Sequence, residues 1–503
     1  MYLHQNKKYH VNTYMNIIRY VNAAYCKLDF TPDLLAEIAT MYIFRPEGYK
    51  FNPKFKANIW DGYIRLVTEH NGRCPVGLVP AILNWMVTNE YPVQMSDEFR
   101  AFGDTINFDL ESLNLPFPPR DYQLQAVDLA LKKKRQTLLL ATSAGKSLVI
   151  YMLARTYVAN GMKTLIIVPN VSLVSQLEAD FTEYSTKNGF DVASQCHFIS
   201  AGIDKSSNKR IVISTWQSLQ GLLKTKAGMD VMKTYDAVIG DEVHLFKATV
   251  LGSLMNAATN AFCRVGLSGT LDGVAASEQT IVSLFGNIRR IVSAKELMDS
   301  GYATKAIVKP VILKYSDQVA KLAKGLPYDS ELDLIVKSKK RNKFLVRFAH
   351  GLNGNALFLF RFVDKHAEVV KAMIEEAYPE KKVFIVSANT SKDDREMIRG
   401  YVEKHTNITI ISTYALFSTG VNIKNLDHVV FASPTASPIK VLQSIGRSLR
   451  KLEGKLIANI WDIVDDLRGD KKSQNHLYRH YSGRLAVYEK EQFEISPLNI
   501  DFV

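Results

Sequence analysis

From residue 137 onward, short apolar runs alternate with amphipathic stretches, and this alternation constrains the fold more than any other feature of the chain. A buried strand, a helix and another buried strand in succession are typical of a parallel sheet flanked by helices. The first series of predicted strands covers residues 137–140, 164–168, 211–214, 237–239 and 265–267. A second series covers residues 356–360, 383–386, 408–412, 429–432 and 457–460. The predicted fold class is therefore α/β, with two tandem domains built on parallel sheets.

Three domains are predicted from changes in this rhythm. Residues 1–110 mix strand and helix signals with clustered aromatic side chains, so we expect a small N-terminal α+β domain there. Residues 111–300 are predicted to form the first α/β domain, and residues 301–503 the second, with a helical tail at its end. The join is placed in the polar passage of residues 292–309, which contains Gly301.

Composition excludes several classes of protein. The 503 residues include 47% hydrophobic side chains, and 63 Lys+Arg against 50 Asp+Glu give a formal charge of +13, which favours polyanionic partners. Four cysteines lie too far apart for the spacing of zinc sites or disulfide frameworks, and we expect reduced thiols at Cys26, Cys74, Cys196 and Cys263. No apolar run approaches the roughly 20 residues of a membrane span, and the polar start MYLHQNKKYH is not a signal peptide. We therefore expect a cytoplasmic protein that does not associate with membranes.

A candidate phosphate loop follows the first predicted strand. Its residues Thr142-Ser143-Ala144-Gly145-Lys146-Ser147 precede a helical run, so backbone N–H groups and the helix dipole would converge on one anion. ATP is the expected occupant, with Lys146 on the β- and γ-phosphates and the Ser147 hydroxyl on Mg²⁺. Leu140 stands where the loop consensus has its first glycine.

An acidic pair follows the apolar run 237–239. Asp241 and Glu242 would lie at the carboxyl end of a parallel strand, in the crevice where such sheets bind ligands. Asp241 is expected to hold Mg²⁺ through water, and Glu242 to orient and deprotonate the attacking water. The alternative, a solvated turn, is disfavoured because the pair comes directly after a buried strand.

With these residues in place, the chain resembles the superfamily-2 helicases, whose motifs follow in the family's order between about residues 120 and 450. The resemblance implies RecA-like domains. It assigns adenine recognition to Arg120, Tyr122 and Gln123. It assigns strand contacts to Pro169, Asn170, Thr215, Trp216, Gln217, Ser387 and Thr413. The motif that couples hydrolysis to domain closure is expected at Ser268 and Thr270, together with His244.

Two further motifs of the second domain carry the resemblance. One contains Gly420, which is expected near the nucleotide, and the other runs from Gln443 to Arg450. The spacing of the latter puts Gln443, Gly446, Arg447 and Arg450 on one face of a helix, and Gly446 would permit close approach to the other domain. Arg447 and Arg450 are predicted to act as arginine fingers on the γ-phosphate when the two domains close.

The likeness extends over nearly the whole chain to the recombination and branch-migration helicases of T4-type phages, the UvsW group. It implies ATP-dependent action on branched or forked DNA or RNA–DNA hybrids, by a monomer in the host cytoplasm if the chain is phage-encoded. Residues 44–66 resemble that group's small duplex-binding domain, and Lys54, Lys56 and Arg65 are expected on phosphates. The aromatic residues Phe51, Phe55 and Trp60 are expected in that domain's core.

Other basic runs give weaker predictions. Lys132-Lys133-Lys134-Arg135 is interpreted as a solvated helix end, and residues 337–343 and 471–484 are candidates for lining a duplex path. Four alternatives stay open: a duplex translocase without strand separation, an RNA helicase, a nucleic-acid-binding module whose ATPase is inactive, and an ATPase unrelated to nucleic acid. The substitution at Leu140 favours the third, whereas the retained Lys146, Asp241 and Glu242 oppose it.

Overall fold

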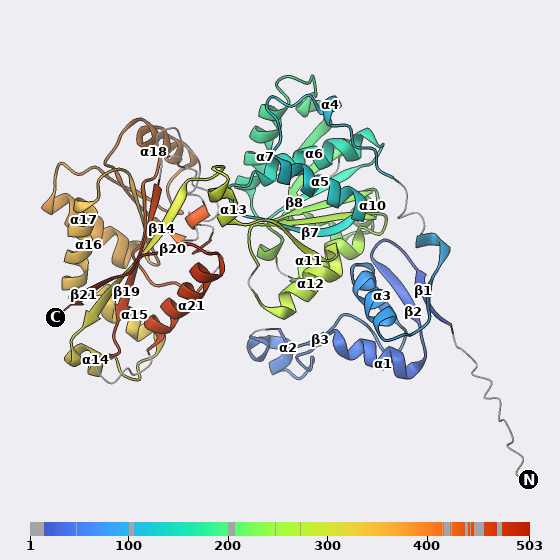
Figure 1. The fold of residues 1–503 in the computed structure, drawn as a ribbon, viewed down its shortest axis with the longest axis horizontal. Helices are drawn as coiled ribbons and strands as arrows, with labels where there is room; N and C mark the ends of the chain where they lie inside the picture. The colour runs from blue at the N-terminus through green and yellow to red at the C-terminus, as the bar shows by residue number, and fades with distance from the viewer. Residues whose placement is uncertain are drawn as a thin grey trace, which may run out of the picture. The chain divides into compact units, whose positions relative to one another are not determined.

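The computed structural model describes residues 15–46, 48–99, 105–199, 207–246, 248–271, 273–414, 416, 423, 425–437, 441–442, 444–446, 457–469 and 475–502. The chain divides into two compact units. The first consists of Met1–Leu138, Leu148–Ser268 and Gly273–Arg289, and the second of Leu139–Ser147, Gly269–Asp272 and Arg290–Val503. Figure 1 shows the fold as a ribbon.

A small mixed sheet begins the first unit. Its described strands are β1 (Asn16–Tyr20), β2 (Tyr25–Asp29), β5 (Arg73–Pro75) and β6 (Val93–Met95), in the order β5-β2-β1-β6. Strand β1 is antiparallel to β2 and parallel to β6. Helices α1 (Pro32–Met41) and α3 (Val79–Thr88) share one core with this sheet, in which Ile18, Ile38 and Ile82 are completely buried. The predicted α+β fold of the N-terminal region is confirmed.

A lobe projects from this region between strands β3 (Ile43–Phe44) and β4 (Ile64–Arg65), which pair antiparallel. It contains a 3₁₀ turn, Tyr49–Phe51, and the short helix α2 (Pro53–Lys56). The prediction that Phe51, Phe55 and Trp60 are core residues is wrong for Phe51, which is 79% exposed, and Phe55 and Trp60 are only partly buried. The lobe is too small to enclose all of its aromatic side chains, and the mixed sheet has a separate core.

The first parallel sheet has seven described strands in the order β13-β7-β12-β11-β8-β10-β9. They are β7 (Arg135–Leu140), β8 (Thr164–Val168), β9 (Cys196–Ile199), β10 (Ile211–Thr215), β11 (Ala237–Asp241), β12 (Cys263–Ser268) and β13 (Ile288–Val292). Pairs β8–β10, β8–β11, β9–β10 and β11–β12 are parallel. All five predicted strands are present, whereas β9 and β13 were not predicted.

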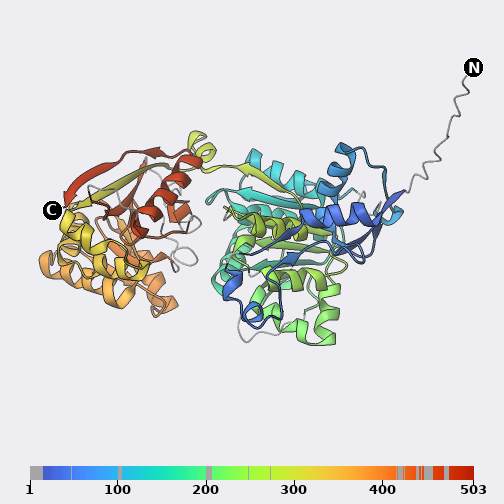
Figure 2. The same ribbon diagram turned by 90° about the horizontal axis from the view of Figure 1, so that it is seen from below.

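Helices connect the strands of this sheet and lie on both of its faces (Figure 2). The described ones are α4 (Leu110–Leu113), α5 (Asp121–Lys133), α6 (Lys146–Ala159), α7 (Val171–Tyr184), α8 (Val192–Gln195), α9 (Trp216–Gln220), α10 (Lys226–Lys233), α11 (Ala248–Ala257) and α12 (Ala275–Phe285). Helix α6 follows β7 after the candidate phosphate loop, as the alternation of apolar and amphipathic segments predicts.

The second unit contains a sheet of eight described strands, with the order β16-β17-β15-β18-β19-β14-β20 and with β21 also paired to β14. They are β14 (Lys305–Tyr315), β15 (Ala356–Phe360), β16 (Val383–Val386), β17 (Thr409–Thr413), β18 (His428–Phe431), β19 (Ile457–Asp466), β20 (Glu494–Ile495) and β21 (Leu498–Phe502). Every described pair in it is parallel. All five predicted strands of the second series are present, and the α/β fold class is confirmed.

The helices of the second unit include α13 (Ala294–Asp299), α14 (Asp317–Ala323), α15 (Tyr328–Val336), α16 (Lys339–Gly351), α17 (Glu368–Ala377), α18 (Lys392–Lys404) and α21 (His476–Lys490). The passage of residues 292–309, interpreted from sequence as a join, contains α13 and the beginning of β14. That passage is therefore largely regular structure.

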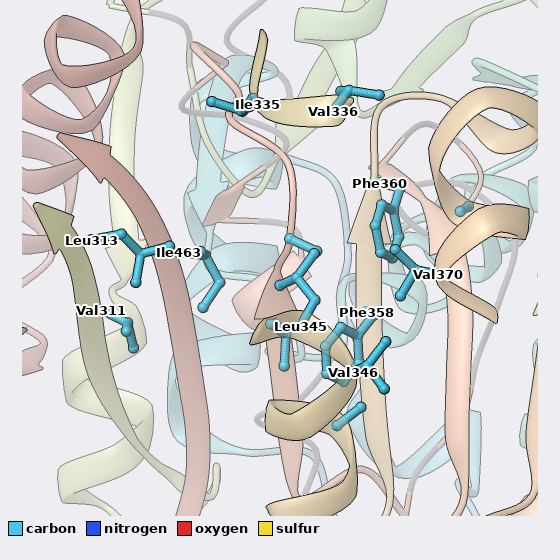
Figure 3. Close-up of a cluster of buried hydrophobic side chains, with 14 of the residues drawn as sticks. Val311, Leu313, Ile335, Val336, Leu345, Val346, Phe358, Phe360, Val370 and Ile463 are labelled. Carbon is cyan, nitrogen blue, oxygen red and sulfur yellow. The ribbon is translucent and has the colours of Figure 1, made fainter. Parts of the chain in front are cut away.

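The core of this unit lies between the sheet and the helices that cover it (Figure 3). Leu345 and Val346 of α16 and Val370 of α17 pack with Phe358 and Phe360 of β15, and all five are at least 96% buried. Complete burial of one such side chain contributes about 1.5–3 kcal/mol. This packing holds β15 in place against α16 and α17. Residues of the candidate site follow the carboxyl end of this strand.

Several cations predicted to be exposed are buried instead. Lys134 and Arg135 are 2% and 9% exposed, so the predicted solvated helix end is wrong for them, and Arg135 belongs to β7 and donates to the Ala23 carbonyl. Arg341 donates to Asp465 and Arg484 donates to Asp462, and both arginines are buried. These two therefore cannot line a duplex path, because each is neutralised inside the protein.

The remaining expectations about the whole chain concern cysteines and membranes. All four cysteines are free and buried, as expected for reduced thiols. Burial raises the pKa of the Cys196 and Cys263 thiols to about 12, which keeps them protonated. Among the residues that the structure describes, no helix has the length and apolar character needed to cross a bilayer.

Candidate functional site

The candidate phosphate loop connects β7 to α6 by a turn with two left-handed residues. Ser143 has φ +71° and Gly145 has φ +74°, and the Ala144 N–H donates to the Ala141 carbonyl at 3.0 Å. Left-handed backbone at a residue with a side chain costs about 1–2 kcal/mol, so the conformation at Ser143 must be held by its surroundings. Alternating right- and left-handed residues turn successive N–H groups toward one point, which suits an anion.

Lys146 opens α6 and lies close to Gly269. A Cβ atom added at Gly269 would lie 3.4 Å from the Lys146 Nζ and 3.2 Å from the Thr142 Oγ1. The loop and the segment that follows β12 are therefore in close contact. The predicted nucleotide residue Lys146 and the predicted coupling segment are brought together.

Gly446 lies against the same loop within the second unit. The Ser143 hydroxyl donates to the Gly446 carbonyl at 2.7 Å, and a Cβ atom at Gly446 would lie 2.3 Å from the Thr142 Cβ. No side chain fits at residue 446 without displacing the loop. The sequence predicted that this glycine permits close approach to the other α/β domain, and that role stays a prediction.

The acidic pair follows β11, as predicted. Asp241 is the last residue of the strand and is 6% exposed, and its Oδ1 accepts from the Glu242 N–H at 3.0 Å. Glu242 has φ +50°, a left-handed conformation that interrupts the strand and directs the chain into the short turn Val243–Leu245. Strands β7 and β11 are separated in their sheet only by β12. A buried carboxylate at this sheet edge is suited to a cation.

The predicted coupling residues are connected by a short hydrogen bond. His244 Nδ1 and Ser268 Oγ are 2.5 Å apart, and the same ring nitrogen lies 3.5 Å from the Glu242 Oε2. The His244 side chain is 1% exposed and Ser268 is completely buried. The carboxylate of Glu242 and the end of β12 are thus linked through one imidazole. Thr270 follows two residues later and is partly buried.

The predicted adenine residues form a compact group at the start of α5. The Arg120 N–H donates to the Gln123 Oε1 at 2.9 Å, and the Arg120 guanidinium donates to the Tyr122 hydroxyl at 2.7 Å. Gln123 is 4% exposed. In this structure the amide oxygen of Gln123 caps the helix, and recognition of adenine by this group stays a prediction.

The strand-contacting residues of the first series lie at two adjacent strand ends. Thr215 of β10 pairs with Val168 of β8, and the Gln217 amide donates to the Pro169 carbonyl at 3.1 Å. Asn170 caps α7 by accepting from the Leu173 N–H, and Thr215 caps α9 by accepting from the Ser218 N–H. Trp216 is partly buried. The structure brings these residues together, and it gives two of their side chains a capping role.

In the second unit, Ser387 and Thr413 also lie at adjacent strand ends. Val386 of β16 pairs with Ser412 of β17, so the residues that follow each of these positions are neighbours. A cavity of 460 Å³ beside Ser387 is lined by residues 361–365 and 387–389, including Arg361 and Lys365. These two exposed cations were not among the residues predicted for the site. The sequence feature that could have identified them is their position directly after the buried strand β15. Neither residue belongs to a conspicuous motif.

The predicted phosphate contacts of the lobe are exposed. Lys54 and Lys56 lie on α2, and Arg65 forms an ion pair with Asp61 at 2.6 Å. The Arg65 guanidinium, through its hydrogen bonds, lowers the pKa of the Asp61 carboxyl. Arg65 is therefore partly neutralised, whereas Lys54 and Lys56 form no ion pair with any residue that the structure describes.

The remaining predicted residues cannot be placed. Gly420, Gln443, Arg447 and Arg450 lie outside the described residues. Their proposed roles on the nucleotide stay predictions from the sequence. No group of three or more His, Cys, Asp or Glu side chains arranged to hold a metal ion was found in the described part of the chain.

Three protein families match successive segments of the chain. The N-terminal family of the DNA helicase UvsW matches residues 16–96, the res subunit family of type III restriction enzymes matches residues 116–273, and the helicase conserved C-terminal domain matches residues 339–451. The three matches cover the small mixed sheet and much of each parallel sheet.

Individual proteins are also similar to the chain. It is 30% identical over 502 residues to the ATP-dependent DNA helicase uvsW of Enterobacteria phage T4, with 95% of this chain and 97% of that protein covered. The crystal structure of T4 UvsW matches 97% of this chain and 100% of its own, with 28% identity and a TM-score of 0.48. A fragment of a putative HsdR subunit of a type I restriction enzyme from Vibrio vulnificus YJ016 is 20% identical, with 80% of this chain and 73% of that chain covered and a TM-score of 0.54. The last likeness supports the fold alone.

Proposed function

The chain belongs to the UvsW family of ATP-dependent DNA helicases, and we propose that its motor acts on branched DNA in recombination, replication and repair. It is an ATP-dependent DNA helicase with two parallel α/β sheets of the RecA-like type. The proposed reactions are branch migration, fork regression and the unwinding of junctions or R-loops by a monomer. The proposed domains are residues 1–110, 111–300 and 301–503.

The residues at the loop suit ATP with Mg²⁺. Two left-handed residues direct N–H groups to one point, Lys146 adds a positive charge, and the carboxylate of Asp241 is buried at the same sheet edge. Ser147 and Asp241 are the side chains that would hold Mg²⁺, which would supply charge neutralisation at the phosphates. Arg120, Tyr122 and Gln123 would contact the adenine, and Gly420 would lie near the nucleotide.

The hydrolytic step is assigned to Glu242. Its carboxylate is partly buried and lies beside His244, and we propose that it orients the attacking water and accepts its proton. Lys146 stabilises the negative charge that develops on the phosphates. His244 lies beside Glu242 and is hydrogen-bonded to Ser268 at the end of β12. We propose that loss of the γ-phosphate shifts Glu242 and, through His244, shifts Ser268 and the following Thr270.

The second α/β domain is proposed to complete the site. Gln443, Arg447 and Arg450 lie within four positions of Gly446 in the sequence, and Gly446 approaches Thr142 of the phosphate loop closely. Arginine fingers act on the transition-state charge and raise the rate only while they are in place. Loss of the γ-phosphate would remove their partner, so ATP binding and hydrolysis would alternate between two arrangements.

The nucleic-acid track is proposed to use strand ends in both sheets. Pro169, Asn170, Thr215, Trp216 and Gln217 would contact one strand from the first sheet, and Ser387 and Thr413 from the second. We add Arg361 and Lys365, which are exposed beside Ser387 and form ion pairs with Asp329 and Asp333. Contacts to the sugar–phosphate backbone carry little sequence information, so the motor should tolerate any sequence and respond to salt.

The observation that carries the proposal is the joint presence of Lys146, Asp241 and Glu242 in a chain aligned over nearly its full length with a DNA helicase. ATP hydrolysis and unwinding should be measured with a four-way junction, a forked duplex, a plain duplex and an RNA–DNA hybrid. We expect ATPase activity to rise most with the branched substrates and to be lost in Lys146→Ala. The matched control is Lys132→Ala, which removes an exposed lysine paired with Asp128 on the same helix.

Each outcome decides between functions. Turnover that does not change when nucleic acid is added would reject the motor. Strong stimulation by plain duplex without strand separation would favour a duplex translocase, and a preference for RNA would favour an RNA helicase. Binding of DNA with no ATPase in the wild type would point to an inactive nucleotide site.

A further inference from the structure

The lobe of residues 45–63 has a small aromatic cluster of its own. Tyr49 and Phe55 pack edge to face with ring centroids 4.9 Å apart, and the Arg45 guanidinium lies over the rings of Tyr49 and Tyr63 at 4.9 and 4.2 Å. Gly62 has φ +84°, and a Cβ atom there would lie 2.7 Å from the Tyr49 ring. The lobe is therefore closed by Arg45, Tyr49, Phe55 and Tyr63, and Phe51 is not needed for its packing.

Phe51 and Ile59 are the most exposed large apolar side chains in the described part of the chain. Their exposed fractions are 79% and 75%, and both lie in this lobe, which Figure 1 shows around α2 and β3. Single exposed apolar residues are ordinary on a protein surface, but two extreme cases in one short lobe indicate a contact surface. Removal of the Phe51 side chain would leave no cavity, so stability does not account for a phenyl ring at this position.

The backbone holds Phe51 in a fixed position. Its N–H donates to the Gly48 carbonyl at 2.9 Å, and the Asn52 side chain accepts from the Lys54 N–H at 3.0 Å to start α2. A ring presented by a 3₁₀ turn and a capped helix loses little conformational entropy when a partner binds. The backbone that presents the phenyl ring is thus fixed before a partner binds.

The charges around the ring identify the class of partner. Lys50, Lys54 and Lys56 are exposed, and none of the three forms an ion pair with any residue that the structure describes. The acidic Asp61, by contrast, is engaged by Arg65. A flat apolar ring beside uncompensated ammonium groups is suited to a base with its flanking phosphates, because stacking is indifferent to base identity and the cations follow the backbone.

We propose that Phe51 stacks on the base exposed at the branch point of DNA, with Lys50, Lys54 and Lys56 on the adjacent phosphates. Bases inside a duplex have both faces covered, so a ring can stack only where the strands part or end. Ile59 extends the apolar contact. This inference rests on the proposed function, and it assigns the recognition of the branch itself to the lobe.

The direct test is photocrosslinking. A forked duplex with 5-iodouracil as the first unpaired base is irradiated with the full-length protein without ATP, and the crosslinked peptide is identified by mass spectrometry. We expect the crosslink at Phe51 and none there when the iodouracil lies inside a plain duplex. A crosslink mapped only to other parts of the chain would overturn the proposal, whatever the ATPase activity of the protein.

Affinity measurements on matched variants distinguish base stacking from a nonspecific apolar contact. Phe51→Ala should weaken binding to the forked duplex by about fivefold to a hundredfold and plain duplex by less than about twofold, which is the contribution of one stacked base. Phe51→Trp should restore binding and Phe51→Leu should not, because leucine is apolar without a flat ring. The control Val87→Ala removes a side chain that is 70% exposed on α3 of the same region, and it should have no effect.

The remaining outcomes also decide the matter. If Phe51→Leu binds the fork as the wild type does, the contact is apolar but not stacking, and the proposal fails. If the wild type sediments with anionic vesicles and Phe51→Ala does not, the lobe is a membrane contact instead. A protein that crosslinks to the fork through Phe51 but whose ATPase ignores DNA would retain this inference and lose the proposed motor.

Discussion

At the residue scale, the hydrogen bond between His244 and Ser268 is the contact that we propose couples ATP hydrolysis to movement. It connects the turn after β11 with the end of β12, and both groups are buried. A hydrogen bond between neutral groups contributes about 0.5–1.5 kcal/mol, and one to a charged group about 1.5–3 kcal/mol. The free energy lost with this bond is therefore too small to unfold the protein. It is large enough to change the balance between the ATP-bound and the hydrolysed arrangement of the motor.

We predict that Ser268→Ala lowers DNA unwinding more than ATP hydrolysis. The number of base pairs separated per ATP should fall by about tenfold, the factor that corresponds to about 1.4 kcal/mol. The measurement is parallel unwinding and ATPase assays on one forked duplex. Ser253→Ala removes an exposed hydroxyl of α11 that donates to the Thr249 carbonyl within its own helix, and it should leave the ratio unchanged. Equal losses in both activities would argue against a coupling role.

His366 provides a second prediction at this scale. Burial, and next the charge of Arg341, lower its pKa from 6.5 to about 3, and its ring lies against Phe360 and the polar groups of Asn342 and Ser433. The folded protein therefore binds this proton more weakly than the unfolded chain does. The stability from neutral His366 is complete above pH 6.5 and is lost as the pH falls toward 3.

Urea denaturation at several pH values tests this. Between about pH 6.5 and 4.5 the wild type should lose about 2–3 kcal/mol of unfolding free energy through this group, since each unit of pH is worth about 1.4 kcal/mol. His366→Gln, which cannot be charged, should be less stable at neutral pH and should have a shallower decline with falling pH. A variant whose decline matches that of the wild type would show that other groups cause it.

The sequence identified single residues well where a motif has fixed spacing and poorly where the fold supplies the context. The positions of Lys146 at the start of a helix and of Asp241 and Glu242 at a strand end were predicted because strand, loop and residue type coincide, and their roles stay proposals. Arg341 and Arg484 were interpreted as candidates for duplex contacts, yet they are buried against Asp465 and Asp462. Those carboxylates lie on β19, at separations of 124 and 22 positions along the chain, so the sequence around each arginine does not indicate its partner.

At the scale of elements, helix α2 combines exposed cations with a fixed orientation. Lys54 and Lys56 are exposed on it, and each should release about one counterion when it neutralises a phosphate. Double substitution Lys54→Ala/Lys56→Ala should reduce the slope of log affinity against log salt by about 2 and weaken binding of all DNA sequences alike.

The salt slope is measured by titrating a forked duplex at several salt concentrations. The control is Lys371→Ala, which removes a lysine engaged with Glu375 on α17. It should leave the slope as it is. An unchanged slope in the double variant would place α2 outside the DNA contact, even if the affinity fell for another reason.

The strands also show which elements an apolar pattern in the sequence can predict and which it cannot. Strands β15 and β8 were predicted to the residue, because a short apolar run bounded by polar residues is typical of a buried strand in a parallel sheet. Strand β14 was not predicted, since Lys305 and Lys309 interrupt the apolar pattern on a strand that pairs with β19 on one edge and β21 on the other. Phe51 was assigned to a core because aromatic spacing alone cannot report how much volume a lobe has to enclose.

At the scale of the whole molecule, the proposal requires that both parallel α/β sheets serve one nucleotide. The first sheet carries the phosphate loop and the acidic pair at the ends of β7 and β11, and the second is proposed to deliver Arg447 and Arg450. The two arginines should then affect hydrolysis without affecting the binding of ATP.

Arg447→Ala tests this division of labour. Because an arginine finger contributes about a thousandfold or more to turnover, DNA-stimulated ATPase should fall by at least that factor, whereas the affinity for a fluorescent ATP analogue should change by less than about fivefold. Lys146→Ala should lose both, since Lys146 belongs to the binding loop itself. Arg399→Ala, which removes a guanidinium engaged with Glu396 and Glu403 on α18, is the matched control and should retain both. If Arg447→Ala hydrolyses ATP within about threefold of the wild type, the first sheet alone is sufficient for hydrolysis, and movement along DNA must be driven from some contact other than the γ-phosphate.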